Sequence, residues 1–374
     1  MSAPSSSPAE TKRDAKAIRR ACTRSVSSQH FRRSPHAALT ELVATLDPAL
    51  DADHYGQGGP VTPFEAEIAT LLGKEAAVFM PSGTMCQQIA LRVWADRNDR
   101  RTIGMHALNH LDVHEQRAYQ VLHNLRGVSI GSPDRLLTLA DLEEVAEPLG
   151  ALLIELPQRE LGGQLPAWED LVVITTWARE RGIALHMDGA RLWESGPFYA
   201  RPYAEIAALF DIVYVSFYKG LGGIAGAVLA GPAAVIAEAR VWRGRHGGQL
   251  IHLYPYVLSA QDSLKRLDLM PRYYEKAVAI AGALATLPGV DLLPNPPHTP
   301  MMHLYLRGER DRLLAAALDI AAETGIWTFD WLGTTPLPNL QTLELNVGDA
   351  TLDLTTEEIV DILSAVLTRA GVSG

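Results

Sequence analysis

The chain has 374 residues, of which 47% are hydrophobic, 20% charged and 7% aromatic, so it is typical of a globular protein with two or three structural units rather than a disordered or disulfide-rich one. The net charge of −10 argues against nucleic acid or an anionic membrane as the main partner. Its two cysteines, Cys22 and Cys86, are too few for a disulfide framework and fit a reducing, cytoplasmic compartment.

Two segments bear on targeting. The first 25 residues are rich in serine and basic residues but contain no apolar stretch, so we expect a mobile tail rather than a secretory signal. The uncharged run 220–237 reaches the length of a membrane span. Glycines and a proline interrupt it, which favours a buried strand-turn-strand segment.

Helices and strands are expected to alternate from residue 62. Thr62 to Glu65 reads as a capping box with proline at the first helical position. The short apolar run 76–80 predicts a buried strand, and the turn at 81–83 leads into a helix that begins near Thr84. Further strands are predicted at 102–105, 128–130, 151–156, 183–187, 212–217 and 225–230.

This alternation predicts an α/β fold with a mostly parallel sheet sandwiched by helices. Functional residues should then lie at the carboxyl ends of the strands. A smaller C-terminal α+β domain is expected after about residue 260, beginning with a long helix at 264–287. The predicted organisation is an N-terminal tail and arm (1–40), a large domain (41–262) and a small C-terminal domain (263–374).

Three features after predicted strands carry chemistry. The turn of Ser82, Gly83 and Thr84 offers free N–H groups and hydroxyls to a phosphate, although taken alone it is better explained as a plain tight turn with an N-cap. Asp188 could keep a heteroaromatic nitrogen protonated, or form an ion pair with Arg191. Lys219 ends an apolar strand, where desolvation lowers an amine's pKa and makes it a Schiff-base nucleophile.

Two further groups are less specific. The basic, glycine-rich stretch 242–248 could bring Arg243 to a phosphate, or be a solvated loop. His106, His110 and His114 are spaced by four, so they would share one face of a helix. That spacing also suits a metal, but the carboxylate that a zincin needs is missing, and no metal site is predicted.

The order of phosphate turn, strand-end aspartate and strand-end lysine resembles that of pyridoxal-phosphate enzymes. Segments 73–84, 185–191 and 219–222, with Tyr55-Gly56 upstream, resemble the low-specificity threonine aldolases and their β-eliminating lyase relatives. The resemblance covers roughly residues 55–260. It implies the aspartate-aminotransferase fold (fold type I), pyridoxal 5'-phosphate as cofactor, a small amino-acid substrate and a homodimer or homotetramer with active sites at the subunit interface.

The resemblance also implies roles for individual residues. Lys219 would carry the cofactor as a Schiff base, and Asp188 would bind its pyridine nitrogen. His110 would stack on the ring with Glu115 at the matching offset, and Arg191 would contact the substrate carboxylate. The phosphate contacts of the family match four positions, namely Ser82, Gly83, Thr84 and Arg243.

Two positions depart from the aldolases and leave the reaction open. Gln158 stands where they have a second active-site histidine, and Glu344 stands where a carboxylate-binding arginine is expected. Both are predicted to contact substrate. The alternatives are Cα–Cβ cleavage of a β-hydroxy-α-amino acid to a glycine-type product and an aldehyde, or β-elimination, transamination, racemisation or condensation on an unusual amino acid or amine. A non-catalytic regulator is disfavoured by the acidic charge.

Overall fold

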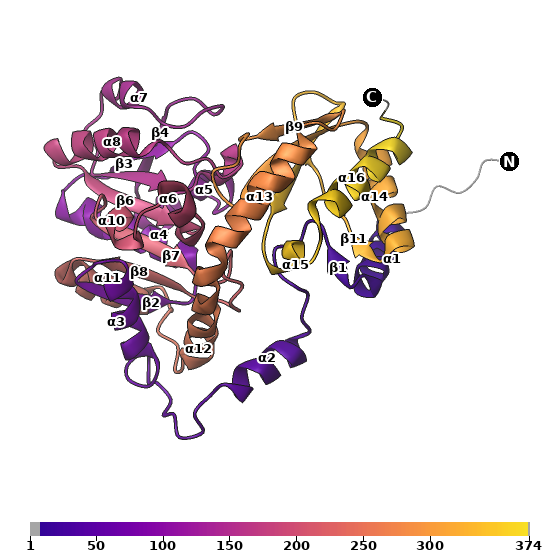
Figure 1. Ribbon diagram of the computed structural model, residues 1–374. Coiled ribbons are helices and arrows are strands. Elements are labelled where there is room, and N and C mark those ends of the chain that lie inside the picture. The colour runs from indigo at the N-terminus through magenta and orange to yellow at the C-terminus, as the bar shows by residue number, and fades with distance from the viewer. Residues whose placement is uncertain (1–7, 373–374) are drawn as a thin grey trace. The chain divides into compact units, whose positions relative to one another are not determined.

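The computed structural model describes residues 8–372, with side chains from residue 15 onward (Figure 1). The chain divides into two compact units. One unit is Arg33–Pro271, and the other combines the chain up to Arg32 with the chain from Arg272. Each unit has its own sheet.

The N-terminal segment differs from the expected tail. Helix α1 (Pro8–Ala21) packs against α14 (Arg310–Thr324), and β1 (Arg24–Ser25) pairs in parallel with β11 (Ile326–Trp327). These contacts, made at long sequence separation, put the segment in the same unit as the C-terminal region. Residues 1–7 of the predicted tail lie outside the described residues.

The larger unit contains a seven-stranded sheet in the order β2-β8-β7-β6-β5-β3-β4. Its strands are β2 (Ala76–Met80), β3 (Thr102–His106), β4 (Arg126–Ile130), β5 (Ala151–Glu155), β6 (Ala184–Gly189), β7 (Ile212–Ser216) and β8 (Ala227–Gly231). All neighbours are parallel except β8, which runs antiparallel to β2 and β7. The predicted α/β class with a mostly parallel sheet is confirmed.

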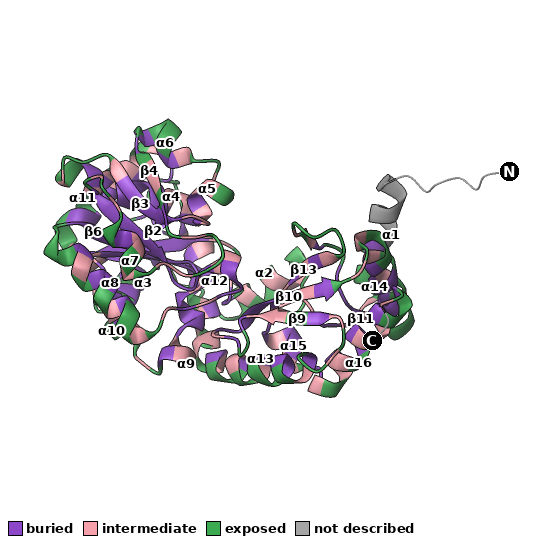
Figure 2. Ribbon diagram, turned by 90° about the horizontal axis from the view of Figure 1, so that it is seen from above, coloured by how far each residue is buried: buried purple, intermediate pink, exposed green. Residues whose placement is uncertain are grey.

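Helices cover the sheet through a continuous apolar core. Helices α4 (Gly83–Arg97) and α11 (Ala233–Arg245) share one buried cluster with β2, β7 and β8, and the strands are buried whereas the outer helix faces are exposed (Figure 2). The other helices of this unit are α2 (Pro35–Ala44), α3 (Val61–Leu71), α5 (His110–Val113), α6 (Ala118–His123), α7 (Leu139–Glu143), α8 (Trp168–Glu180), α9 (Gly196–Tyr199), α10 (Tyr203–Ala207) and α12 (Tyr254–Ser263). Short 3₁₀ turns are η1 (Arg159–Leu161), η2 (Leu192–Glu194) and η3 (Leu264–Leu269).

Three local expectations were wrong. Helix α3 begins at Val61 without a side-chain cap, because the Thr62 hydroxyl instead accepts from Gly58 N–H at 3.1 Å. In the uncharged run 220–237 the predicted strand is present as β8, but the start of α11 follows it where a second strand was expected. The predicted helix 264–287 is η3 followed by α13 (Met270–Leu284).

The smaller unit is built on an antiparallel sheet of order β12-β13-β10-β9. Its strands are β9 (Val290–Leu293), β10 (Met301–Arg307), β12 (Gly333–Thr334) and β13 (Leu340–Asn346). Helices α14 and α16 (Thr356–Arg369) pack on each other, and α15 (Asp349–Leu352) contacts β1. Among the described residues, no helix is long and apolar enough to cross a membrane.

Candidate active site

The carboxyl ends of the parallel strands gather the predicted site residues at one edge of the larger sheet. Ser82 follows β2, Asp188 lies near the end of β6, and Lys219 follows β7. Since β2 and β7 are both antiparallel to β8, they are parallel to each other and their carboxyl ends share this edge. The fold therefore places the predicted phosphate turn, aspartate and lysine at the same edge of the sheet.

The turn after β2 is capped as the sequence suggests. Helix α4 begins at Gly83, and the Ser82 hydroxyl accepts from Met85 N–H at 3.3 Å. A Cβ atom on Gly83 would lie 1.9 Å from the hydroxyl of Tyr214 on β7. Glycine is therefore required for the turn to approach the sheet this closely, and the first N–H groups of α4 remain available to an anion.

Arg243 reaches β2, the strand before this turn, from a helix and not from a loop. Helix α11 continues to Arg245, so the expected glycine-rich loop begins only after it. The Arg243 side chain is buried, its Nη1 donates to Phe79 O at 2.9 Å, and its Nη2 donates to Tyr55 O at 3.4 Å. Its Nε atom is buried without a hydrogen-bond partner among the described residues. Burial lowers the pKa of the guanidinium, and nearby Glu65 opposes this.

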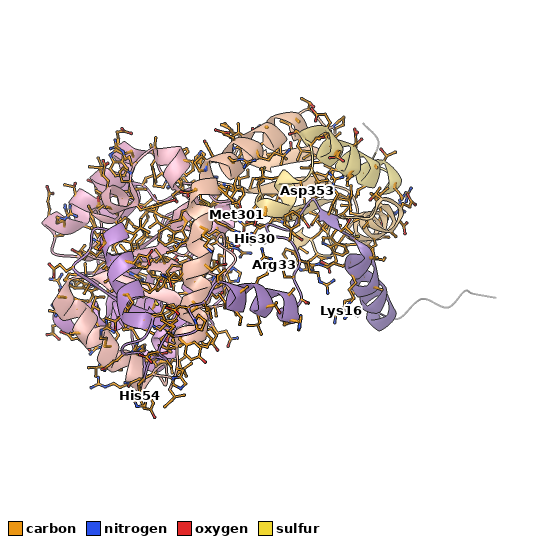
Figure 3. All side chains as sticks on the ribbon, turned by 60° about the horizontal axis from the view of Figure 1, so that its bottom comes forward. Lys16, His30, Arg33, His54, Met301 and Asp353 are labelled. Carbon is orange, nitrogen blue, oxygen red and sulfur yellow. The ribbon has the colours of Figure 1, made fainter. Side chains whose placement is uncertain are left out.

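Asp53 holds the Tyr55 segment against this arginine. Its buried carboxylate accepts from Gly56 N–H at 3.0 Å and from the N–H groups of Leu253 and Tyr254. A Cβ atom on Gly56 would lie 2.8 Å from Arg243 Nη2, which explains why glycine follows Tyr55. The neighbouring His54 is exposed at the surface of the larger unit (Figure 3).

Asp188 is held by hydrogen bonds at both oxygens. Ala190 N–H donates to Oδ1 at 3.0 Å, and the side-chain amide of Gln87 donates to Oδ2. The other end of that amide meets Nε2 of His186. Gln87 was not predicted as a site residue. The one indication of its role in the sequence is that it is a polar residue on the buried side of α4.

The surroundings of Lys219 favour its neutral amine. Burial and the cation of Arg191 lower the pKa of Lys219, and the carboxylates of Asp188 and Glu155 oppose this. The carboxylate of Glu194 lies against the next residue, since a Cβ atom on Gly220 would be 2.2 Å from Glu194 Oε1. The same oxygen lies 4.0 Å from Arg191 Nε, so Arg191 pairs with Glu194.

Gln158 donates a hydrogen bond to a neighbouring carboxylate, that of Glu155. Its Nε2 donates to Glu155 Oε2 at 3.1 Å and to Leu108 O at 2.9 Å, and Arg159 N–H donates to Glu155 Oε1 at 3.1 Å. Burial, with repulsion from Asp188, raises the pKa of Glu155 to about 7. Glu155 was not predicted as a site residue, although it ends a strand at this edge of the sheet.

The three histidines do not share a helical face. His106 is the last residue of β3, buried with Nε2 beside Ser132 O and Arg135 O. His110 begins α5, and its Nδ1 lies 3.3 Å from Oε1 of the buried Glu115 side chain. The rings of His110 and His114 have centroids 4.9 Å apart. The strand ends before the helix begins, which separates His106 from the other two.

Glu344 lies in the smaller unit, on β13. Burial alternates along this strand, and Glu344 is on its less buried face. Its Oε1 accepts from Asn346 Nδ2 at 2.9 Å, and its Oε2 lies 3.9 Å from His303 Nε2. A role toward substrate stays a prediction.

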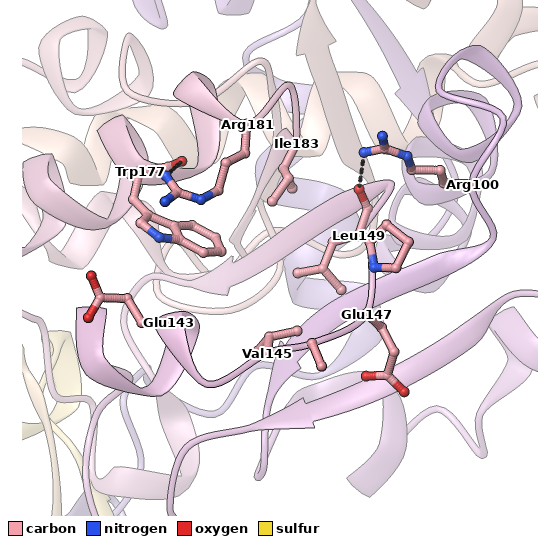
Figure 4. Close-up of a pocket in the computed structure, with 10 residues that line it drawn as sticks. Arg100, Glu143, Val145, Glu147, Leu149, Trp177, Arg181 and Ile183 are labelled. Atoms are coloured by element: carbon pink, nitrogen blue, oxygen red, sulfur yellow. Dashed lines mark hydrogen bonds between the residues drawn. The ribbon is translucent and has the colours of Figure 1, made fainter.

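The opposite edge of the sheet has a hollow of its own (Figure 4). This cavity of about 580 Å³ is lined by residues that precede β3, β5 and β6, including Arg100, Leu149 and Ile183, and by Trp177 and Arg181 of the α8 region. Arg100 Nη1 donates to Leu149 O at 3.3 Å. None of the predicted site residues lines it.

Comparison with known proteins identifies the family. Residues 35–307 match the family model of the beta-eliminating lyases. The chain belongs to the beta-eliminating lyase family. This confirms the predicted family, and with it an enzyme of the lyase class.

Solved structures support this assignment over nearly the whole chain. A candidate L-allo-threonine aldolase from Listeria monocytogenes EGD-E is 41% identical to this beta-eliminating lyase family member, with a TM-score of 0.91 over 96% of this chain and 99% of that one. A candidate aromatic amino acid beta-eliminating lyase/threonine aldolase from Exiguobacterium sp. 255-15 is also 41% identical, with a TM-score of 0.90 over 95% and 99%. A serine palmitoyltransferase from Sphingomonas wittichii, 14% identical with a TM-score of 0.65 over 91% and 85%, shares the fold.

Curated relatives match over a shorter stretch. Aldolase vrtJ of Penicillium aethiopicum is 34% identical over 245 residues, which cover 63% of this chain and 62% of the relative. The low specificity L-threonine aldolase of Saccharomyces cerevisiae is 28% identical over 222 residues, which cover 58% and 57%. The matched region thus spans less than two thirds of these relatives.

Proposed function

We propose that this protein is a pyridoxal 5'-phosphate-dependent lyase that cleaves the Cα–Cβ bond of a β-hydroxy-α-amino acid, giving a glycine-type product and an aldehyde. The observation that carries the proposal is the placement of Lys219 and Asp188 at the ends of adjacent parallel strands β7 and β6, with the pKa of the lysine lowered by burial. The similarity to threonine aldolases supports the reaction class.

The chemistry of the available donors fits this cofactor. A phosphate needs several donors and a positive charge, which the N-terminus of α4, the Ser82 and Thr84 hydroxyls and the buried Arg243 would supply. Arg243 Nε is buried without a partner among the described residues, so this donor is available to an anion. Asp188 would bind the ring nitrogen, and Lys219 would form the covalent link.

When bound, the cofactor supplies an electron-withdrawing ring that stabilises a carbanion at the substrate's Cα. Asp188 contributes by keeping the ring nitrogen protonated, because an ionised carboxylate beside that nitrogen favours its cationic form. Arg191 would bind the substrate carboxylate from its position beside Glu194. A guanidinium can hold a carboxylate through two parallel hydrogen bonds, which also orients the substrate.

His110 and Glu115 provide a base for the β-hydroxyl proton. The Glu115 carboxylate can only accept, so its 3.3 Å contact places a proton on His110 Nδ1. In the neutral form of the ring the opposite nitrogen, Nε2, then carries no proton and can take the one from the substrate hydroxyl. The remaining role that the family resemblance gives His110 is to stack on the cofactor ring.

Gln158 favours a second candidate reaction. Both N–H bonds of its amide are used, on Glu155 and on Leu108 O, so its carbonyl oxygen remains for a substrate donor. An amide cannot carry the proton that a histidine at this position would carry. β-Elimination, transamination, racemisation or condensation on an unusual amino acid or amine is therefore the alternative.

Assembly and compartment belong to the same proposal. Tyr55, Leu250 and Ile251 are exposed apolar residues. Tyr55 N–H donates to Ile251 O at 2.9 Å, and Tyr55 O accepts from Arg243 Nη2 at 3.4 Å. A second copy of the chain covering them would give a homodimer, or a homotetramer, with the active site at the interface. We expect a cytoplasmic protein, since Cys22 and Cys86 are free thiols.

The test is a substrate screen of the purified holoenzyme. β-Hydroxy-α-amino acids should give aldehyde and glycine in equal amounts, measured by coupled reduction of the aldehyde and by amino-acid analysis. Keto acid and ammonia without aldehyde would favour β-elimination instead. A purified protein that shows no bound cofactor by visible absorbance after reconstitution would contradict the proposal.

A further inference from the structure

Three buried side chains form a line that begins with the carboxylate facing the proposed cofactor. Asp188, Gln87 and His186 are respectively 2%, 0% and 0% exposed. Asp188 and His186 are alternate residues of β6, so they lie on the same face of that strand. Gln87, from α4, bridges them with the two ends of its amide.

The direction of each hydrogen bond follows from the chemistry of the groups. An ionised carboxylate only accepts, so the Gln87 Nε2–H must face Asp188 and the Gln87 carbonyl must face His186. That carbonyl also only accepts, so His186 must carry a proton on Nε2. Burial lowers the pKa of His186 to about 4, so near neutral pH the ring is uncharged and this nitrogen is its protonated one.

Packing alone does not explain Gln87. The glutamine sits in the same helix as the apolar residues of the α4 core, including Cys86, Ile89 and Ala90. Burying an amide there is unfavourable unless both ends are hydrogen-bonded. A methionine of similar volume would fill the space without that requirement.

We propose that Gln87 is a positioning residue that, anchored by the Nε2–H of His186, donates to Asp188 and holds its carboxylate in one orientation toward the cofactor nitrogen. This inference rests on the proposed function. A donor to the charged form stabilises that form. Ala190 N–H holds the other oxygen, so Gln87 controls the one part of the carboxylate that the backbone does not hold.

The first test needs no variant. The ¹⁵N chemical shifts of His186 in the wild-type apoprotein at neutral pH, assigned by loss of the signal in His186→Gln, should show the Nε2–H tautomer. A ring protonated only on Nδ1 would overturn the proposal. This measurement does not depend on cofactor binding, so it separates a failure of the hydrogen-bond order from a failure of the proposed function.

The second test compares Gln87→Met with Gln88→Met in the reconstituted holoenzyme. Gln88 is the adjacent buried glutamine, 3% exposed, and lies outside the line. We expect Gln87→Met to lower kcat about tenfold to hundredfold with little change in KM, as for loss of a hydrogen bond to a charged group, and to shift the pH titration of the bound cofactor's absorbance. Gln88→Met should leave the titration unchanged.

A third variant covers the possibility that Gln87→Met does not fold. Gln87→Glu keeps the shape but replaces the donor by a second carboxyl group beside Asp188, so it should shift the cofactor titration further than methionine does. A cofactor titration in Gln87→Glu identical to wild type, or equal effects of Gln87→Met and Gln88→Met, would overturn the proposal.

Discussion

The two ends of the proposed cofactor site are built by different means. At the Asp188 end, a single carboxylate is fixed by a buried line of side chains from β6 and α4. At the Ser82 end, the donors are mainly backbone N–H groups of α4, assisted by one buried guanidinium. The end that would bind the ring nitrogen depends on one charge in one orientation, whereas the end that would bind the phosphate uses several hydrogen-bond donors.

Removing the amine of Lys219 should have the largest effect on activity. Lys219→Ala eliminates the amine that forms the covalent link, so activity should fall below detection and borohydride should leave no cofactor on the protein. Non-covalent binding should persist because both ends remain. Lys265→Ala, at an exposed lysine, is the matched control. Recovery of the reduced cofactor on another lysine would contradict the assignment.

Breaking the carboxylate end should affect turnover more than binding. Asp188→Asn removes the charge but keeps the shape, and we expect kcat to fall about a thousandfold or more, about 4 kcal/mol of transition-state stabilisation. The dissociation constant for the cofactor, measured by fluorescence quenching, should change much less. Activity close to that of the wild type would exclude Asp188 as the ring partner.

The buried histidines predict a loss of stability in acid. Burial lowers the pKa of both His186 and His123 to about 4, so the folded state binds fewer protons than the unfolded state below the ordinary value of about 6.5. The free energy of unfolding should be unaffected above pH 7 and should fall between about pH 6.5 and 4, by about 3 kcal/mol per group as an upper value. Urea titrations at pH 7.5, 6 and 5 measure it.

A variant separates the two contributions. His123→Gln should make the stability profile less steep, whereas His36→Gln, at an exposed position in α2, should leave it unchanged. A free energy of unfolding that is constant from pH 7.5 to 5 would contradict the prediction.

Weakening the phosphate end should reduce affinity. Arg243→Gln removes one buried cation but leaves the N–H groups of α4, so cofactor affinity should fall about tenfold to hundredfold, about 2 kcal/mol. At saturating cofactor, kcat should change less. Arg245→Gln, two residues on and exposed, is the control. Equal effects of the two substitutions would argue against a specific role for Arg243.

The smallest effect is expected outside both ends, at Glu344. An anion where aldolases carry a carboxylate-binding arginine should disfavour a substrate carboxylate and favour a cationic group, so L-threonine should be a poor substrate. Glu344→Gln should improve L-threonine and weaken substrates with a distal amine or guanidinium, each by about fivefold, about 1 kcal/mol. Rapid turnover of both L-threonine and L-allo-threonine, together with no effect of Glu344→Gln, would refute this role of Glu344.

The sequence predicted the elements whose signals are local. Strands β2, β5, β7 and β8 appear as mainly apolar runs, and the Ser82 turn carries its own cap and glycine. Arg243 was recognised, but its glycine-rich neighbours suggested a loop where the structure has helix α11. The N-terminal pairing of β1 with β11 could not be predicted, because two-residue strands have almost no periodicity.

For the site, the sequence by itself determined which reactive groups end the strands: Asp188 and Lys219 follow apolar runs whose direction in a parallel sheet brings them to one edge. Only the tertiary structure decided what surrounds them. Gln87 reaches Asp188 from another helix, and Glu194 lies against the glycine after Lys219. These contacts join residues distant in sequence, so their burial and pKa shifts arise only when the chain has folded.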